Sequence, residues 1–173
     1  ASRRTYSVTV WVECGTFFLF FFCFFLMIGD HRDLHSFPTR RSSDLQEVIA
    51  GDLDNDGDLD VVVTVEREDS IKWYENNGSQ GFTAHTINTV GDGPTGLNLA
   101  DVNGDGKIDI LSVSHWDNTG WLHLNNGDQT FTSTAFSTAL AQPRSVFTAD
   151  ISGDGILDLV TGSQNDKIMW HEN

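Results

Sequence analysis

The chain has 173 residues, of which 39% are hydrophobic, and this length and composition suit one globular domain with an appendage. It carries 10 Lys and Arg against 25 Asp and Glu, and the resulting net charge of -15 would repel a phosphate backbone, so nucleic acid is excluded as the expected partner. Sixteen glycines against three prolines predict many tight turns between short strands and argue against a helical bundle.

The first 45 residues differ from the rest of the chain. They hold both cysteines, Cys14 and Cys23, and seven of the twelve phenylalanines lie within residues 17–25 alone. Residues 46–173 hold 21 acidic and 5 basic residues, whereas residues 1–45 hold 4 and 5. We therefore treat residues 1–45 as a leader and residues 46–173 as the folded domain.

The leader contains an apolar run and a segment with an unusual likeness. The run over residues 16–28 is shorter than the roughly 20 residues that cross a bilayer, and no A-x-A cleavage site follows it, which argues against a signal peptide or anchor. Residues 29–45, GDHRDLHSFPTRRSSDL, resemble one translated frame of a common short-read sequencing adapter. We interpret residues from about 17 to 45 as non-native and expect them to be unstructured or helical. The phenylalanine run alone also fits a real hydrophobic segment.

Residues 46–173 contain copies of one unit. Asp52, Asp101 and Asp150 lie 49 residues apart, and each opens an acidic stretch of nine residues: DLDNDGDLD, DVNGDGKID and DISGDGILD. The units are 47–95, 96–144 and 145–173, and the last is shorter than the others. The repeat therefore sets the fold.

Each unit reads as four short strands. A β-branched run follows each acidic stretch, at residues 61–65, 110–113 and 159–161, and its continuous apolar character fits a buried inner strand. Aromatic-containing segments ending in Asn come next, at 71–76, 121–125 and 168–173, and Asn-Gly hairpin signals at 77–78 and 126–127 lead to strands at 82–87 and 131–136. Residues 96–100 and 145–149 lead into the following acidic stretch. The expected fold is all-β, a partial β-propeller of about two and a half four-stranded blades.

The acidic stretches and the W-x-x-N segments at residues 73–76 and 170–173 resemble FG-GAP or VCBS-type repeats, the calcium-binding blades of integrin-like β-propellers. The resemblance covers residues 47–173. The literal Phe-Gly and Gly-Ala-Pro elements are absent, so the chain is closer to bacterial-style repeats than to integrins. The resemblance implies up to three Ca²⁺ ions and ligand contacts on loops that the sequence does not identify.

The residue types of the acidic stretches point to the same ion. Ca²⁺ takes six to eight oxygen ligands, and alternating short side chains around a glycine turn supply them. The candidate ligands, with backbone carbonyls at Asp58, Lys107 and Ile156, are Asp52, Asp54, Asp56, Asp58 and Asp60; Asp101, Asn103, Asp105, Lys107 and Asp109; and Asp150, Ser152, Asp154, Ile156 and Asp158. The first stretch has one more ligating carboxylate than the others and is expected to bind most tightly.

Two other interpretations fit these stretches less well. An EF-hand needs a Glu at position 12 and flanking helices, whereas position 12 is Val63, Ser112 or Thr161 and the flanks are strand-like. Solvated Asp-Gly turns without an ion are the second alternative, but several like charges within nine residues are unfavourable unless a cation neutralises them.

The expected function is recognition or adhesion by an extracellular or cell-surface protein, with calcium in a structural role and no catalysis. The four histidines of the repeats, His85, His115, His123 and His171, do not recur at one repeat position, and no serine or cysteine nucleophile is tied to them by motif. The alternative is the propeller of a secreted polysaccharide-acting enzyme, or a lectin. Closed propellers use about four to eight blades, so we expect a fragment whose remaining blades are missing from this chain, with a protein or glycan ligand.

Overall fold

The computed structural model describes residues 6–8, 23–25, 44–79, 81–88 and 91–172, and the chain divides into two units, Ala1–Ser43 and Asp44–Asn173. In the first unit, β1 (Tyr6–Val8) and β2 (Cys23–Phe25) pair antiparallel, with Tyr6 opposite Phe25. The expectation of an unstructured or helical leader is therefore wrong for these six residues, whose aromatic and β-branched types favour strands. The adapter-like residues 29–43 and most of the phenylalanine run lie outside the described residues.

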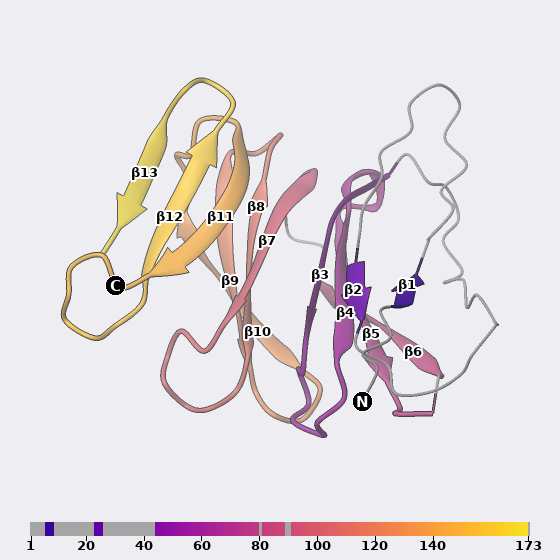
Figure 1. Ribbon diagram of the computed structural model, residues 1–173. Coiled ribbons are helices and arrows are strands. Elements are labelled where there is room, and N and C mark those ends of the chain that lie inside the picture. The colour runs from indigo at the N-terminus through magenta and orange to yellow at the C-terminus, as the bar shows by residue number, and fades with distance from the viewer. Residues whose placement is uncertain (1–5, 9–22, 26–43, 80, 89–90, 173) are drawn as a thin grey trace. The chain divides into compact units, whose positions relative to one another are not determined.

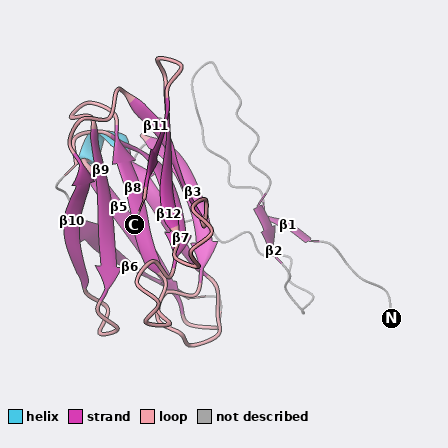
Figure 2. Cartoon of the chain, turned by 90° about the vertical axis from the view of Figure 1, so that its left-hand side faces the viewer, coloured by secondary structure: helices cyan, strands magenta, loops and turns pink. Residues whose placement is uncertain are grey.

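The second unit consists of three antiparallel sheets whose strands follow one another in chain order (Figure 1). We call them blades one, two and three. A single 3₁₀ turn, η1 (Glu66–Glu68), is the only helical element among the described residues (Figure 2). The strands are β3 (Leu45–Gly51), β4 (Asp60–Val65), β5 (Ser70–Asn76) and β6 (Phe82–Asn88) in blade one; β7 (Pro94–Ala100), β8 (Asp109–Ser114), β9 (Thr119–Asn125) and β10 (Phe131–Ser137) in blade two; and β11 (Pro143–Ala149), β12 (Asp158–Ser163) and β13 (Ile168–His171) in blade three.

The 49-residue period holds at both ends of nearly every strand, which confirms the all-β, partial-propeller prediction. The second strand of a blade lies inside its sheet, and all six residues of β4 and of β8 are buried. This agrees with the continuous apolar runs of the sequence, because a strand covered on both faces does not alternate.

Blade one begins earlier than the expected boundary at residue 46. Leu45 pairs with Val65, and the backbone carbonyl of Asp44 accepts the Glu66 N–H at 2.7 Å. Leu45 occupies the position that Pro94 and Pro143 hold in the other blades. The last two residues of the adapter-like segment are therefore part of the repeat structure.

The core lies between the sheets. Leu53, Val62 and Trp73 of blade one pack with Leu97 and Ile110 of blade two. A second cluster joins Val102, Leu111 and Val113 of blade two to Val146 and Leu159 of blade three. The blades thus stack face to face, as in a propeller, and the three sheets do not close into a ring.

Blade three is one residue shorter at the turn before its last strand. Ile110 pairs with His123, whereas its counterpart Leu159 pairs with His171, 48 residues on from His123. Trp170 consequently takes the place that Trp73 holds in blade one, in agreement with the shared W-x-x-N pattern.

Candidate metal centre

Each acidic stretch forms the loop between the first and second strands of its blade; we call them loops one, two and three. Each loop has two residues with a left-handed backbone. The second is always glycine, with φ of 95° at Gly57, 84° at Gly106 and 89° at Gly155, as the sharp bend requires. The first is Asn55 in loop one, at φ 61°, and glycine in the other two.

The first aspartate of each loop holds the loop backbone in place. Asp52 accepts the N–H of Asp56 through Oδ1 at 3.2 Å and the N–H of Gly57 through Oδ2 at 3.0 Å. Asp101 and Asp150 accept the N–H groups of the equivalent residues at 2.9–3.1 Å. These bonds hold the loop backbone in its bend in all three blades.

The last aspartate of each loop is buried and bonded to the backbone. Asp60 accepts Leu53 N–H through Oδ2 at 2.9 Å and Asn76 N–H through Oδ1 at 2.8 Å. Asp109 repeats both bonds with Val102 and Asn125, at 3.1 and 2.9 Å. Burial raises the pKa of Asp60 and of Asp109, while these N–H donors act in the opposite direction. The residue predicted as the last ion ligand therefore also ties the loop to the blade.

The asparagine that ends the third strand supports the loop from the other side, and the sequence analysis did not identify this role. The Asn76 side-chain amide donates to the Leu59 carbonyl at 3.1 Å, and Asn125 donates to Ile108 at 3.1 Å. Asn125 Nδ2 also lies 2.7 Å from the carbonyl of Leu53, and so joins blade two to loop one. The recurrence of this asparagine after 49 residues was the signal available in the sequence.

Loop one gathers three carboxylates. Oxygen atoms of Asp52, Asp54 and Asp60 all lie within 4.8 Å of one another, and no second group of three Asp, Glu, His or Cys side chains comes this close within the described part of the chain. Partial burial raises the pKa of Asp54 against the hydrogen bond from the Asp56 N–H, and the Asp60 and Asp56 carboxylates raise it further. Clustered hard oxygens with a raised proton affinity are a donor set that suits a divalent cation such as Ca²⁺.

Of the other two predicted ligands of loop one, Asp56 is exposed and Asp58 is half-buried. Asp56 Oδ1 accepts the Asp58 N–H at 2.8 Å. The three-carboxylate group does not include either of them.

Loops two and three differ at the position of Asp54, where they have Asn103 and Ser152. In loop two the predicted carbonyl residue Lys107 points its ammonium group at Asp105, with Nζ 2.8 Å from Oδ2. This hydrogen bond lowers the pKa of Asp105 and raises that of Lys107. In loop three the Ile156 N–H donates to Asp154 Oδ1 at 2.9 Å, and the N–H of Ser152 donates to Asp158 Oδ2 at 2.9 Å.

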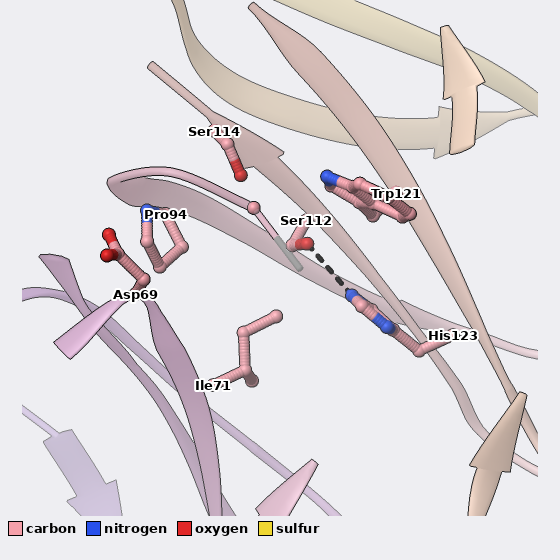
Figure 3. Close-up of a pocket in the computed structure, with 8 residues that line it drawn as sticks. Asp69, Ile71, Pro94, Ser112, Ser114, Trp121 and His123 are labelled. Carbon is pink, nitrogen blue, oxygen red and sulfur yellow. Dashed lines mark hydrogen bonds between the residues drawn. The ribbon is translucent and has the colours of Figure 1, made fainter. Parts of the chain in front are cut away.

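A pocket between blades one and two holds polar groups of a different kind (Figure 3). His123 Nε2 lies 3.0 Å from Ser112 Oγ, and His123 Nδ1 lies 2.7 Å from Ser133 Oγ. Burial lowers the pKa of His123 to about 4. A serine rather than a carboxylate faces Nδ1, so the pair lacks the group that orients and charges the imidazole of a Ser-His-Asp triad. The residues that line the pocket include Asp69, Ile71, Ser112, Ser114, Trp121 and His123.

No helix among the described residues is long and apolar enough to cross a membrane. A comparison with curated proteins gives no match. A comparison with protein families finds the FG-GAP-like repeat twice, at residues 52–112 and 101–161. The two matches are offset by 49 residues, the interval that separates the blades, and together they span more than half of the chain. With its three stacked sheets and three aspartate loops, the chain belongs to the FG-GAP-like repeat family and forms a propeller-like repeat domain.

Proposed function

We propose that residues 44–173 form a calcium-stabilised segment of a β-propeller in an extracellular or cell-surface protein that acts in recognition or adhesion. The observation that carries the proposal is the convergence of Asp52, Asp54 and Asp60 in loop one. The Asp60 carboxylate is held in a fixed position, because both of its oxygens accept hydrogen bonds from buried backbone N–H groups. Asp54 completes the donor set from the loop.

The charge of the domain explains why an ion would stabilise it. Residues 46–173 carry 21 acidic and 5 basic residues, and the acidic residues concentrate in three loops. A bound Ca²⁺ ion supplies positive charge where these carboxylates otherwise repel one another. Loops two and three offer Asn103 and Ser152 as neutral oxygen donors at the Asp54 position, so we propose up to three ions, with loop one as the tightest site.

An extracellular location suits such sites, because sites of extracellular modules have dissociation constants of about 10⁻⁴–10⁻³ M and calcium outside cells is millimolar. A recognition role is favoured over catalysis by the environment of the Ser112–His123 pair. Both side chains are about 1% exposed, and the histidine is held neutral by burial. Neither group is available to a substrate. The ligand of the propeller is a protein or a glycan.

Thermal unfolding of the full chain tests the proposal. With a dissociation constant of about 10⁻⁴ M, millimolar calcium stabilises the fold by roughly 1.4 kcal/mol per site. We expect the Tm to rise by several degrees on adding calcium and to return to its starting value with chelator. Magnesium at the same concentration is the control, because it demands tighter octahedral geometry and gives up its water reluctantly. An unchanged Tm in calcium would overturn the proposal.

A further inference from the structure

The backbone of Leu53 is held from two blades. Leu53 lies between Asp52 and Asp54, two of the three carboxylates that converge in loop one. Its N–H donates to Asp60 of blade one at 2.9 Å, whereas its carbonyl accepts a hydrogen bond from the Asn125 side chain of blade two at 2.7 Å. The peptide groups on both sides of Leu53 are therefore held, and these are the groups that connect it to Asp52 and Asp54.

Blade two holds the Leu53 side chain as well. This side chain is 3% exposed and belongs to the core cluster that also contains Leu97 and Ile110 of blade two. A further contact joins the bends of the two loops, where Asn55 Nδ2 lies 3.5 Å from the Gly106 carbonyl. Blade two thus helps to determine where this part of loop one lies, although all three converging carboxylates belong to blade one.

Asn125 is itself held in place by several bonds. It is 4% exposed, its backbone N–H donates to Asp109 at 2.9 Å, and its side-chain oxygen accepts the Gly127 N–H at 2.9 Å. Its side-chain amide has two N–H groups, and the amide nitrogen donates to the carbonyls of Leu53 and Ile108. A single amide therefore joins loop one to the end of loop two.

Asn76 holds the equivalent position in blade one and shows that the bond to Leu53 is separable from the rest. Its amide donates to the Leu59 carbonyl, and its oxygen accepts the Gly78 N–H. These are the counterparts of the bonds that Asn125 makes within blade two. Of the two asparagines, only Asn125 has a side-chain bond to a neighbouring blade among the described residues.

We propose that Asn125 is a positioning residue for a cation in loop one, and that the bound cation in turn holds blade one against blade two. This inference rests on the proposed calcium role of loop one. Converging carboxylates repel one another without an ion, so a scaffold that holds them together beforehand strengthens binding. Because coupling is reciprocal, an ion that gains affinity from the contact between Leu53 and Asn125 also strengthens that contact.

A calcium titration followed by NMR tests the positioning role, with the Gly57 amide as the reporter of loop one and the Gly106 amide as that of loop two. We expect Asn125→Ala to weaken the calcium affinity of loop one about tenfold, the lower end of the effect of removing a group that orients metal ligands. Asn126→Ala is the matched control, because Asn126 is exposed and its amide donates to Thr130 within its own hairpin. It should bind calcium as the original chain does.

A second measurement uses the original chain and so does not depend on the folding of a variant. The side-chain amide signals of Asn125 should shift on adding calcium and their hydrogen exchange should slow, whereas those of Asn126 should stay unchanged. Insensitivity of the Asn125 signals would show that the ion does not strengthen the contact between the blades.

The outcomes separate this inference from the proposed function. If calcium shifts the Gly57 signal of the original chain and Asn125→Ala leaves the affinity of loop one unchanged, the positioning role is overturned while the calcium site stands. If calcium does not shift the Gly57 signal of the original chain at all, loop one is not a calcium site, and both proposals fail.

Discussion

Blades one and two have the same backbone and different chemistry in their loops. All four strands of blade two begin and end 49 residues after those of blade one. Asp60 and Asp109 make the same two bonds to the backbone. Yet Asp54 of loop one is replaced by Asn103. The comparison separates two tasks of the aspartates: one carboxylate holds the blade together in both copies, whereas the carboxylates that we propose as ion ligands vary around it.

The interiors of the two blades differ as well. Val63, Tyr74 and Ala84 of blade one correspond to Ser112, His123 and Ser133 of blade two. The serine and histidine side chains form a chain of hydrogen bonds that is buried at Ser112 and His123 and half-buried at Ser133, and blade one has apolar groups and a tyrosine in its place. The repeat therefore accommodates polar side chains inside a blade when each of them has a hydrogen-bond partner.

The largest expected effect concerns what the blades share. In chelator, Asp60→Ala and Asp109→Ala should each lower the free energy of unfolding by about 4 kcal/mol, because each leaves two buried N–H groups without an acceptor, at about 1–3 kcal/mol apiece. Urea denaturation followed by tryptophan fluorescence measures both. Equal losses would support a common structural role.

Asparagine at the same two positions retains one acceptor oxygen, so Asp60→Asn and Asp109→Asn can be measured in the same way if the alanine variants do not fold. Adding calcium then distinguishes the loops. We expect Asp109→Asn to keep the stabilisation that loop one supplies and Asp60→Asn to lose it. If Asp60→Ala or Asp109→Ala lowered the free energy of unfolding in chelator by less than about 1 kcal/mol, the structural role would be contradicted, since such a loss is closer to that of a surface substitution.

The buried histidine is expected to give blade two a sensitivity to acid. Burial lowers the pKa of His123 in the folded protein to about 4, below the ordinary 6.5, so the unfolded chain takes up a proton before the folded one does. The contribution of His123 to the free energy of unfolding is therefore fully present above pH 6.5 and is lost as the pH falls toward 4. The loss over this window is about 3 kcal/mol, at 1.36 kcal/mol per pKa unit. His123→Gln should remove this part of the pH dependence while the rest remains.

Denaturation of both proteins at pH 7, 5.5 and 4, in chelator, measures the difference. The His123 imidazole signals in NMR provide a direct check, because they should titrate near pH 4 in the folded protein. Titration near 6.5 would show that the imidazole is accessible to water, contrary to its 1% exposure.

The repeat pattern carried most of the fold, because a strict period reports the positions of strands and turns even where single residues vary. The bend at Gly57 and the strand at residues 61–65 followed directly from residue type. The dual role of Asp60 did not, since its partners are backbone N–H groups of Leu53 and Asn76, which any residue type possesses. The contact between Ser112 and His123 was also beyond the sequence, because it depends on register between β8 and β9.

The smallest expected effect concerns the residue by which loops one and two differ, Asp54 or Asn103, and exchanging the two residue types tests it. Asp54→Asn removes a carboxylate from the three-carboxylate group, and Asn103→Asp builds the equivalent group in loop two. If loop one supplies most of the calcium response, the first variant should lose roughly 1.4 kcal/mol of stabilisation in millimolar calcium and the second should gain a comparable amount. The double variant should then match the original chain.

Isothermal titration locates the change, because the tightest site should move from loop one to loop two. Should Asp54→Asn bind calcium as tightly as the original chain, the convergence of Asp52, Asp54 and Asp60 would serve the loop fold alone, and the calcium response would have to come from the amide and hydroxyl donors of the other loops.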